Sequence, residues 1–156
     1  MEGRIRFSYT LEILVCRANS PFGRVSDYVN PTNDYCSQAI SVKINGAPVQ
    51  GSTVHATYQN QVADVSYVFV GDGRRVRVST CFPYTTTAHN FVLLDGGCTS
   101  YYLRGSTASS APNCTNLKDD TAASFEFDTV DARSYPILVY PRVPGAWGHF
   151  AIQVTA

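Results

Sequence analysis

The sequence has little charge and no long hydrophobic stretch. Charged residues account for 15% of the 156 positions, and acidic and basic residues balance at 12 each, whereas about a quarter of an average soluble domain is charged. Without net charge, the chain has no electrostatic attraction to nucleic acid or to an anionic membrane surface. No segment approaches the roughly 20 apolar residues of a membrane helix. We therefore expect neither a nucleic-acid partner nor insertion into a membrane.

The sequence also lacks the residue spacing of a zinc site. Its five cysteines include no Cys-x-x-Cys pair, and its three histidines lie far apart, so zinc is not expected. In a chain rich in Ser, Thr, Tyr and Gly, oxidised cysteines in an extracellular compartment are the favoured interpretation. Asn113 begins an Asn-Cys-Thr glycosylation sequon, so the secreted protein is predicted to be a glycoprotein.

What the sequence does contain is alternation of apolar and polar residues with a period of two, which predicts strands. Many short strands between Gly-rich turns favour an all-β fold, a two-sheet sandwich of the jelly-roll type, because two sheets cover each other's apolar faces. Gly71-Asp72-Gly73 predicts a tight hairpin between the strands on either side. The predicted strands are Ser37–Ile44, Thr53–Tyr58, Val65–Val70, Arg74–Cys81, Phe91–Leu94, Ser100–Arg104, Ala123–Asp128, Tyr135–Tyr140 and His149–Val154.

The clearest alternation lies near the N-terminus, between Arg4 and Cys16. This run of about twelve residues is about twice the usual strand length. One face would carry Ile5, Phe7, Tyr9, Leu11, Ile13 and Val15, and the other Arg4, Arg6, Ser8, Thr10 and Glu12. Residues 17–33 contain Pro21, Gly23 and Pro31 with little periodicity. We therefore predict an extended strand over residues 1–16, a linker over 17–33 and a sandwich domain over 34–156.

This N-terminal strand leaves two alternatives open. It folds onto its own domain as an edge strand, or it completes a sheet of a neighbouring copy by β-augmentation. Burial of its six apolar side chains would contribute roughly 10–15 kcal/mol at about 2 kcal/mol each, and ordering the chain costs a comparable sum. A head-to-tail contact does not close and propagates as a fibre. The second alternative is favoured, which makes other copies of the chain the expected partner.

Six segments from Asn33 onward follow one another in a recognisable order. They are Asn33–Ile40, Asp64–Phe69, Val76–Cys81, Asn90–Cys98, Cys114 with Asp119-Asp120, and Tyr135–Val139 with Gly148–Ile152. In order and spacing they resemble the bacterial pre-peptidase C-terminal domains and their relatives. The resemblance implies a jelly-roll-like sandwich attached to secreted proteins, generally non-catalytic, with roles in binding, secretion or anchoring. Two features depart from the family: four residues separate Cys114 from Asp119, and the N-terminal strand has no counterpart.

The cysteines predict a disulfide framework with one thiol left over. Cys81 and Cys98 end successive predicted strands 17 positions apart, and a bridge between them would contribute roughly 3 kcal/mol. Cys36 and Cys114 would then pair across a long loop. Four cysteines allow three connectivities, so the other pairings stay open. Cys16 is either a free thiol or bonded to another copy.

Acid–base and metal chemistry have weak candidates. Calcium could take oxygen ligands from the acidic turn residues Asp95, Asp119 and Asp120, but such residues are common in turns for backbone reasons, so no cofactor is expected. The candidates for a catalytic base or nucleophile are His55, His89, His149, Ser66 and Ser79. No Gly-x-Ser-x-Gly motif or paired carboxylates accompany them, so the sequence predicts a protein that is not an enzyme.

Aromatic residues offer a second function, as an accessory domain of a larger secreted hydrolase that binds carbohydrate or protein. Tyr and Trp present a flat apolar face with a polar tip, which suits stacking on sugar rings. The candidates are Tyr84, Tyr101, Tyr102 and Trp147. Trp147 lies in a Pro- and Gly-containing turn before the last predicted strand, where the alternative interpretation is that it closes the end of the sandwich. An extracellular assembly module remains the leading hypothesis, with the binding domain second.

Overall fold

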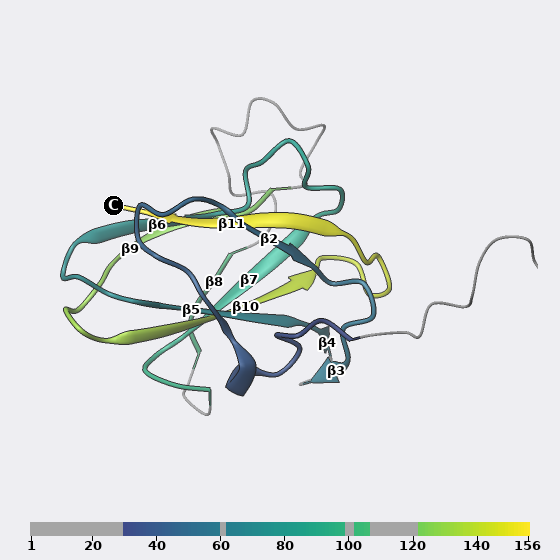
Figure 1. The fold of residues 1–156 in the computed structure, drawn as a ribbon, viewed down its shortest axis with the longest axis horizontal. Helices are drawn as coiled ribbons and strands as arrows, with labels where there is room; N and C mark the ends of the chain where they lie inside the picture. Colours follow the sequence, from purple (N-terminus) through teal and green to yellow (C-terminus); the bar gives the residue numbers. More distant parts are fainter. Residues whose placement is uncertain (1–29, 60–61, 99–101, 107–121) are drawn as a thin grey trace, which may run out of the picture.

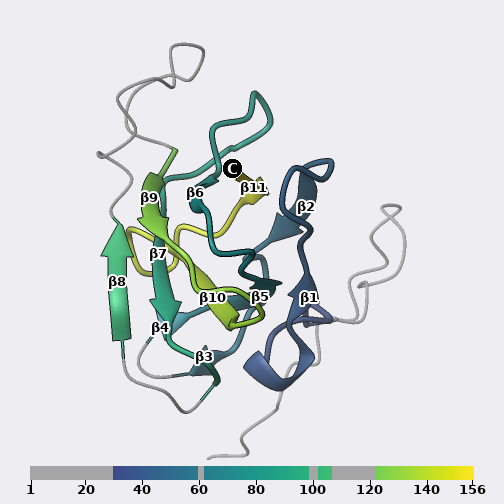
Figure 2. The ribbon, with the colours of Figure 1, turned by 90° about the vertical axis from the view of Figure 1, so that its left-hand side faces the viewer.

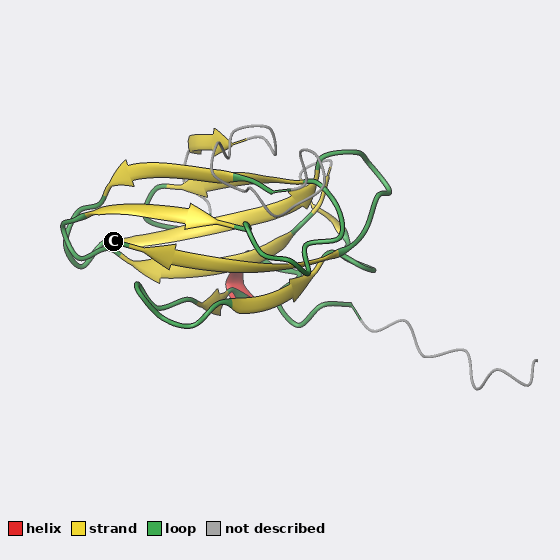
Figure 3. Ribbon diagram, turned by 90° about the horizontal axis from the view of Figure 1, so that it is seen from above, coloured by secondary structure: helices red, strands yellow, loops and turns green. Residues whose placement is uncertain are grey.

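Two β-sheets pack face to face in the computed structural model, which describes residues 30–59, 62–98, 102–106 and 122–156 (Figure 1). The strands are β1 (Ile40–Ser41), β2 (Val49–Ser52), β3 (Tyr58–Gln59), β4 (Val62–Ala63), β5 (Val65–Val70), β6 (Arg75–Ser79), β7 (His89–Leu94), β8 (Tyr102–Ser106), β9 (Ser124–Asp128), β10 (Ser134–Pro141) and β11 (His149–Thr155). One sheet has the order β1-β5-β10-β7-β8 and the other β2-β11-β6-β9. The predicted two-sheet sandwich is confirmed, and the two layers are visible in Figure 3.

The core between the sheets follows from the period-two pattern of the strands. In β6, Val76 and Val78 are buried, whereas Arg75 and Arg77 between them are exposed. Successive side chains of a strand point to opposite faces, so every second residue faces the other sheet. Aromatic rings join the layers: the Phe91 ring of β7 lies 6.0 Å from the Phe125 ring of β9.

Two of the predicted strands are wrong. The segment Thr53–Tyr58 is mainly a turn, and the strand precedes it as β2. His55 has a φ of 62°, which a strand does not allow. The segment Ser37–Ile44 contains only the two-residue β1, preceded by a short 3-10 helix, η1 (Cys36–Gln38). It cannot continue in one sheet, because β1 pairs with β5 whereas Ile44 bridges Val154 of the opposite sheet.

The hairpin predicted at Gly71-Asp72-Gly73 is also wrong. The strands on either side of this turn, β5 and β6, belong to different sheets. The Gly71 backbone is held by residues 132 and 133 of the neighbouring turn, because Gly71 N donates to Arg133 O and Gly71 O accepts from Ala132 N, at 2.8 and 2.9 Å. The turn therefore passes from one layer of the sandwich to the other instead of joining two partners of one ladder.

The predicted Cys81–Cys98 bridge and the Cys36–Cys114 pairing that depends on it are wrong, because a disulfide joins Cys36 to Cys98. Cys81 follows β6 at the end of the sandwich where β7 begins, and Cys98 follows the other end of β7. A six-residue strand spans about 20 Å, far beyond the reach of a disulfide. Cys81 is itself disulfide-bonded. Cys16 and Cys114 lie outside the described residues.

The Cys36–Cys98 disulfide closes a loop with a sequence separation of 62, which corresponds to about 4 kcal/mol of stabilisation in the chain-entropy description. We predict that the double variant Cys36→Ala/Cys98→Ala loses about that much free energy of unfolding in urea denaturation. Peptide mapping without reduction should yield a fragment that links Cys36 to Cys98. A fragment linking Cys81 to Cys98 would contradict the structure.

Candidate functional site

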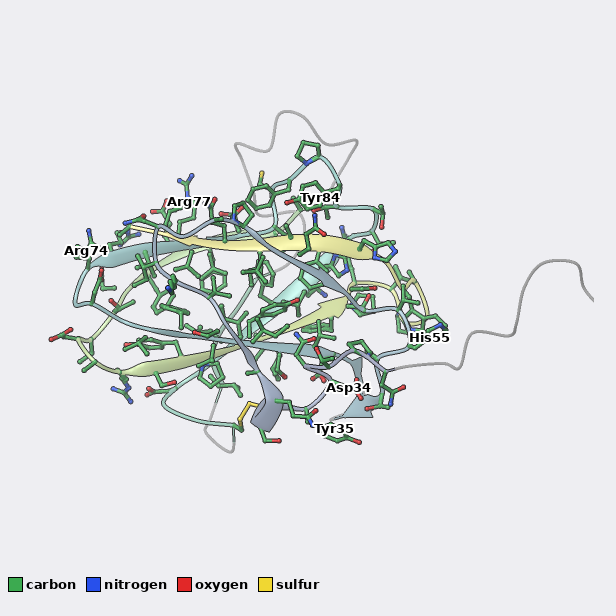
Figure 4. The ribbon with its side chains drawn as sticks, in the orientation of Figure 1. Asp34, Tyr35, His55, Arg74, Arg77 and Tyr84 are labelled. Carbon is green, nitrogen blue, oxygen red and sulfur yellow. A yellow bond between two sulfur atoms is a disulfide. The ribbon has the colours of Figure 1, made fainter. Side chains whose placement is uncertain are left out.

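A cleft of about 490 Å³ lies where residues 31–33 run beside β2 and the start of β11. Its lining residues come from four separate parts of the chain and include two histidines. They are Pro31, Thr32, Asn33, Ile40, Gln50, Gly51, Ser52, Val54, His55, Tyr67 and His149. Figure 4 shows His55 at this end of the molecule, with Asp34 nearby. The sandwich thus brings together residues that the sequence separates by more than a hundred positions.

An aromatic pair stands at the rim of the cleft. The indole ring of Trp147 lies 5.6 Å from the imidazole ring of His55, with an angle of 57° between the planes. Trp147 is 42% exposed, so it does not close the end of the sandwich as a buried plug would. Trp147 does not line the cleft itself, but it contacts His55, which does.

The backbone next to Trp147 is held from two sides. Gly148 N donates to Thr53 Oγ1 at 3.1 Å, and Thr53 N donates to Gly148 O at 2.9 Å. His149 N donates to Thr86 Oγ1 at 2.9 Å. A Cβ at residue 148 would lie 2.1 Å from Thr87 Oγ1, so only glycine permits this close approach. The backbone that follows Trp147 is thus fixed by the sandwich rather than by the turn alone.

The floor of the cleft contains the end of a buried tyrosine. Tyr67 of β5 is fully buried, and its hydroxyl has no hydrogen-bond partner of normal geometry in the described part of the chain. A Cβ at Gly51 would lie 2.0 Å from this hydroxyl, so the glycine in β2 leaves the space that it occupies. Burial raises the pKa of Tyr67 to about 12, an effect that the neighbouring Asn33 side chain reduces. The hydroxyl is therefore neutral below that pH and lies buried beneath the cleft.

Two buried carboxylates lie near the cleft without lining it. Asp34 accepts hydrogen bonds from Thr57 N at 2.7 Å and from Thr57 Oγ1 at 2.6 Å. Burial raises the pKa of Asp64 to about 6, and the negative charge of Asp34 adds to this rise. Asp34 thereby fixes the turn after His55.

A third titratable group, His89, lies in the core between the sheets. Its ring centroid is 4.7 Å from that of Phe150, and its Nε2 is 3.3 Å from Thr87 Oγ1. Burial lowers its pKa to about 4. His89 is therefore a neutral core residue above that pH, and its fully buried side chain gives no support to a role as a catalytic base.

The remaining candidates from the sequence are not brought to the cleft. Ser66 is buried, Ser79 Oγ accepts a hydrogen bond from Cys81 N, and Asp95 forms an ion pair with Arg133. Tyr84 is 40% exposed but stacks on Phe82 outside the cleft, with ring centroids 5.9 Å apart. The side chain of Tyr102 at the start of β8 is not described. Outside the described residues lie Tyr101, Asn113, Asp119, Asp120 and the predicted strand Arg4–Cys16.

Three residues in or beside the cleft were not predicted to have that role. The sequence suggests His55 only for acid–base chemistry and Gly148 only as part of a family-like segment, and it gives no role to Gly51. The close approaches of Gly51 and Gly148 depend on residues far away in the sequence, which no local pattern reveals. In the described ranges, no group of three His, Cys, Asp or Glu side chains is arranged to hold a metal ion. Those ranges also contain no helix with the length and hydrophobicity needed to cross a membrane.

Comparisons with known proteins concern the fold alone. No protein-family profile and no curated protein matches the chain. Among solved structures, it is similar to the crystal structure of the pre-peptidase C-terminal domain of a collagenase from Bacillus anthracis, with a TM-score of 0.49 and 14% sequence identity. The match covers 74% of this chain and 93% of that domain. This is the family that the sequence motifs resemble, and the function of the cleft has to be derived from its own residues.

The shifted pKa values of Asp64 and His89 predict opposite pH dependences of stability. For Asp64, the folded chain keeps its proton up to about pH 6 and the unfolded chain only to about 3.8, so its contribution falls as the pH rises through this window. For His89, the unfolded chain gains a proton near pH 6.5 and the folded chain only near 4, so its contribution falls as the pH drops through that window.

We therefore predict that the two effects largely cancel between pH 4 and 6 in the wild type. Asp64→Asn should make the free energy of unfolding fall on acidification, by up to about 1.4 kcal/mol per pH unit. His89→Gln should make it fall on raising the pH. Urea denaturation at several pH values measures both slopes, and identical slopes in the two variants would contradict the assignment.

Proposed function

We propose that the chain is a non-catalytic binding module of an extracellular protein and that its cleft holds a neutral carbohydrate. The observation that carries the proposal is the exposed indole of Trp147, packed against His55, a residue that lines a cleft with several polar side chains. A sugar ring has a flat apolar face and a rim of hydroxyl groups. An exposed aromatic ring suits the face, and side-chain amides and hydroxyls suit the rim.

The charge of the cleft supports a neutral ligand. No Asp, Glu, Lys or Arg is among the described residues that line it. The polar groups there are the side chains of Thr32, Asn33, Gln50 and Ser52, the hydroxyl of Tyr67 and two imidazoles. A phosphorylated or strongly acidic ligand would meet no cationic side chain of fixed charge, whereas a polyhydroxylated ligand finds both donors and acceptors.

The fixed backbone beside Trp147 also favours binding. A ligand that orders a mobile loop loses part of its binding free energy to conformational entropy. Here the hydrogen bonds of Gly148 and His149 hold the adjacent backbone in place before any ligand arrives. An extracellular location fits the same proposal, because the Cys36–Cys98 disulfide persists in an oxidising compartment.

We predict that Trp147→Ala weakens binding to a neutral insoluble polysaccharide by about 10-fold or more, because truncation of a central aromatic contact costs about 2 kcal/mol. Tyr84→Ala is the matched control, since Tyr84 is 40% exposed and Trp147 42%, and it should bind like the wild type. Pull-down isotherms on cellulose, chitin and a β-1,3-glucan measure the effect. Equal losses in both variants, or no binding by the wild type, would refute a sugar site in the cleft.

The second proposed function is self-assembly of the extracellular protein into a fibre through the segment Arg4–Cys16. The observation that favours it is the unequal width of the sheets in the described part of the chain, five strands against four. An additional strand beside the smaller sheet would match the larger one, and strand addition from another chain is an established mode of association. The alternation of residues 4–16 supplies one apolar and one polar face for this purpose.

We predict that deletion of residues 1–16 leaves a soluble monomer, whereas the complete chain forms oligomers that grow with concentration. Sedimentation velocity and negative-stain imaging report the sizes. Cys16→Ser is the control that separates strand exchange from disulfide linkage, and it should assemble like the wild type. A complete chain that stays monomeric, or a deletion variant with an unchanged oligomeric state, would end this second proposal.

A further inference from the structure

Two histidines line the cleft, and the fold places both of them next to one serine of β2. β2 and β11 are neighbours in the smaller sheet (Figure 2), and Ser52 of β2 pairs with His149 of β11. Residues directly opposite each other in a ladder share one face of the sheet, so the side chains of Ser52 and His149 lie on the same face. His55 follows Ser52 by three residues, and all three residues line the cleft. The cleft therefore contains two groups that take up charge on mild acidification.

The backbone at His55 is unusual for a histidine. Its φ is 62°, a left-handed conformation that glycine and asparagine adopt more readily. The turn is held on both sides, because Val54 N donates to Ser52 Oγ at 3.1 Å and Thr57 N donates to Asp34 Oδ1 at 2.7 Å. Strained backbone of this kind is concentrated at functional sites. The choice of histidine here thus supports a role for the imidazole itself.

The backbone of His149 is also held in place. His149 N donates to Thr86 Oγ1 at 2.9 Å, and His149 O accepts from Thr86 N at 2.9 Å. His149 is exposed, whereas His55 is half-buried and contacts Trp147. An indole ring attracts a nearby cation, so this contact is compatible with a charged imidazole. Neither histidine therefore has to leave its place in the fold to take up a proton.

Among the described residues, no carboxylate lines the cleft. The charged or titratable side chains on the elements around the two histidines are those of Asp34, Asp64, Tyr67, His89 and Arg142. Of these, only Tyr67 is a lining residue, and it stays neutral because burial raises its pKa to about 12. The Asp34 carboxylate accepts the two hydrogen bonds of Thr57, and His89 packs on Phe150 in the core. Protonation of both cleft histidines thus turns a neutral lining into a positive one.

We infer that the protonated cleft binds a carboxylated sugar, an inference that rests on the proposed function. An imidazolium donates from both ring nitrogens, and its hydrogen bond to a carboxylate is about twice as strong as one between neutral groups. A uronic acid keeps the ring of a neutral sugar and carries a carboxylate in place of the hydroxymethyl group. The imidazolium still donates to hydroxyl groups, so the neutral ligand is retained. On acidification, the cleft gains a second class of ligand.

Binding at two pH values tests this inference on the complete chain. The probes are cellulose, chitin and a β-1,3-glucan, each beside its C6-oxidised form, whose carboxylates remain charged at about pH 5. The oxidised form should bind about 10-fold more tightly at about pH 5 than at about pH 8, because a charge-assisted hydrogen bond contributes about that factor. Binding of the neutral form should change little. Pull-down isotherms measure both forms.

Variants of the two histidines assign the gain to the cleft. His55→Asn and His149→Gln should each lower it, and the double variant should lose it. Asparagine suits the left-handed backbone of residue 55, and residue 149 is exposed, so both variants are expected to fold, which circular dichroism at each pH checks. Lys43→Gln is the matched control, because it removes one positive charge from an exposed residue outside the cleft, and it should keep the gain.

The results separate the inference from the proposed function. Binding of a neutral polysaccharide without a gain for its oxidised form, or a gain that survives in the double variant, overturns the inference and leaves the proposed function in place. A gain that Lys43→Gln loses to the same extent is an effect of overall charge, which also overturns the inference. No binding of either form at either pH ends the proposed function and the inference with it.

Discussion

The face-to-face packing of the two sheets is the constraint on which the rest of the described structure depends. Aromatic residues of the two layers share one core, as the Tyr67–Phe150 contact at 5.9 Å illustrates. At one margin, the chain itself crosses from the larger to the smaller sheet between β1 and β2, and the cleft forms beside this crossing. At the other margin, no described segment faces β8. Within the described residues, one side of the sandwich is thus closed by its own chain.

The cleft shows how a rigid core can position residues that lie in turns. Trp147 and His55 both belong to connections between strands, which is where binding residues are common. Their positions are nonetheless determined by the sheets, because Thr53 and Gly148 join the two turns by hydrogen bonds. Tyr67 extends from one sheet to the edge of the other, and Gly51 leaves room for its hydroxyl. The same packing that stabilises the sandwich therefore shapes the floor and the rim.

The sequence predicts what depends on local periodicity. The strands β5, β9, β10 and β11 and the two-sheet architecture follow from the alternation, because burial of every second residue is a local signal. The sequence also gives Trp147, which lies in a turn, as a candidate for stacking on a ligand. The predictions that were wrong depend on contacts between residues that are far apart in the sequence. The crossing after β1, the sheet change at Gly71 and the Cys36–Cys98 bond are all set by which strands become neighbours. Periodicity predicts that a strand exists but not which strand lies beside it.

The central claim is that a neutral sugar occupies the cleft beside Trp147. An NMR titration of the ¹⁵N-labelled protein with neutral oligosaccharides tests it most directly, because each backbone amide and the indole N–H report separately. We expect the largest chemical-shift changes at Trp147, Gly51 and Gly148, with little change at Tyr84. No changes with any oligosaccharide, or changes confined to residues outside the cleft, would contradict the account.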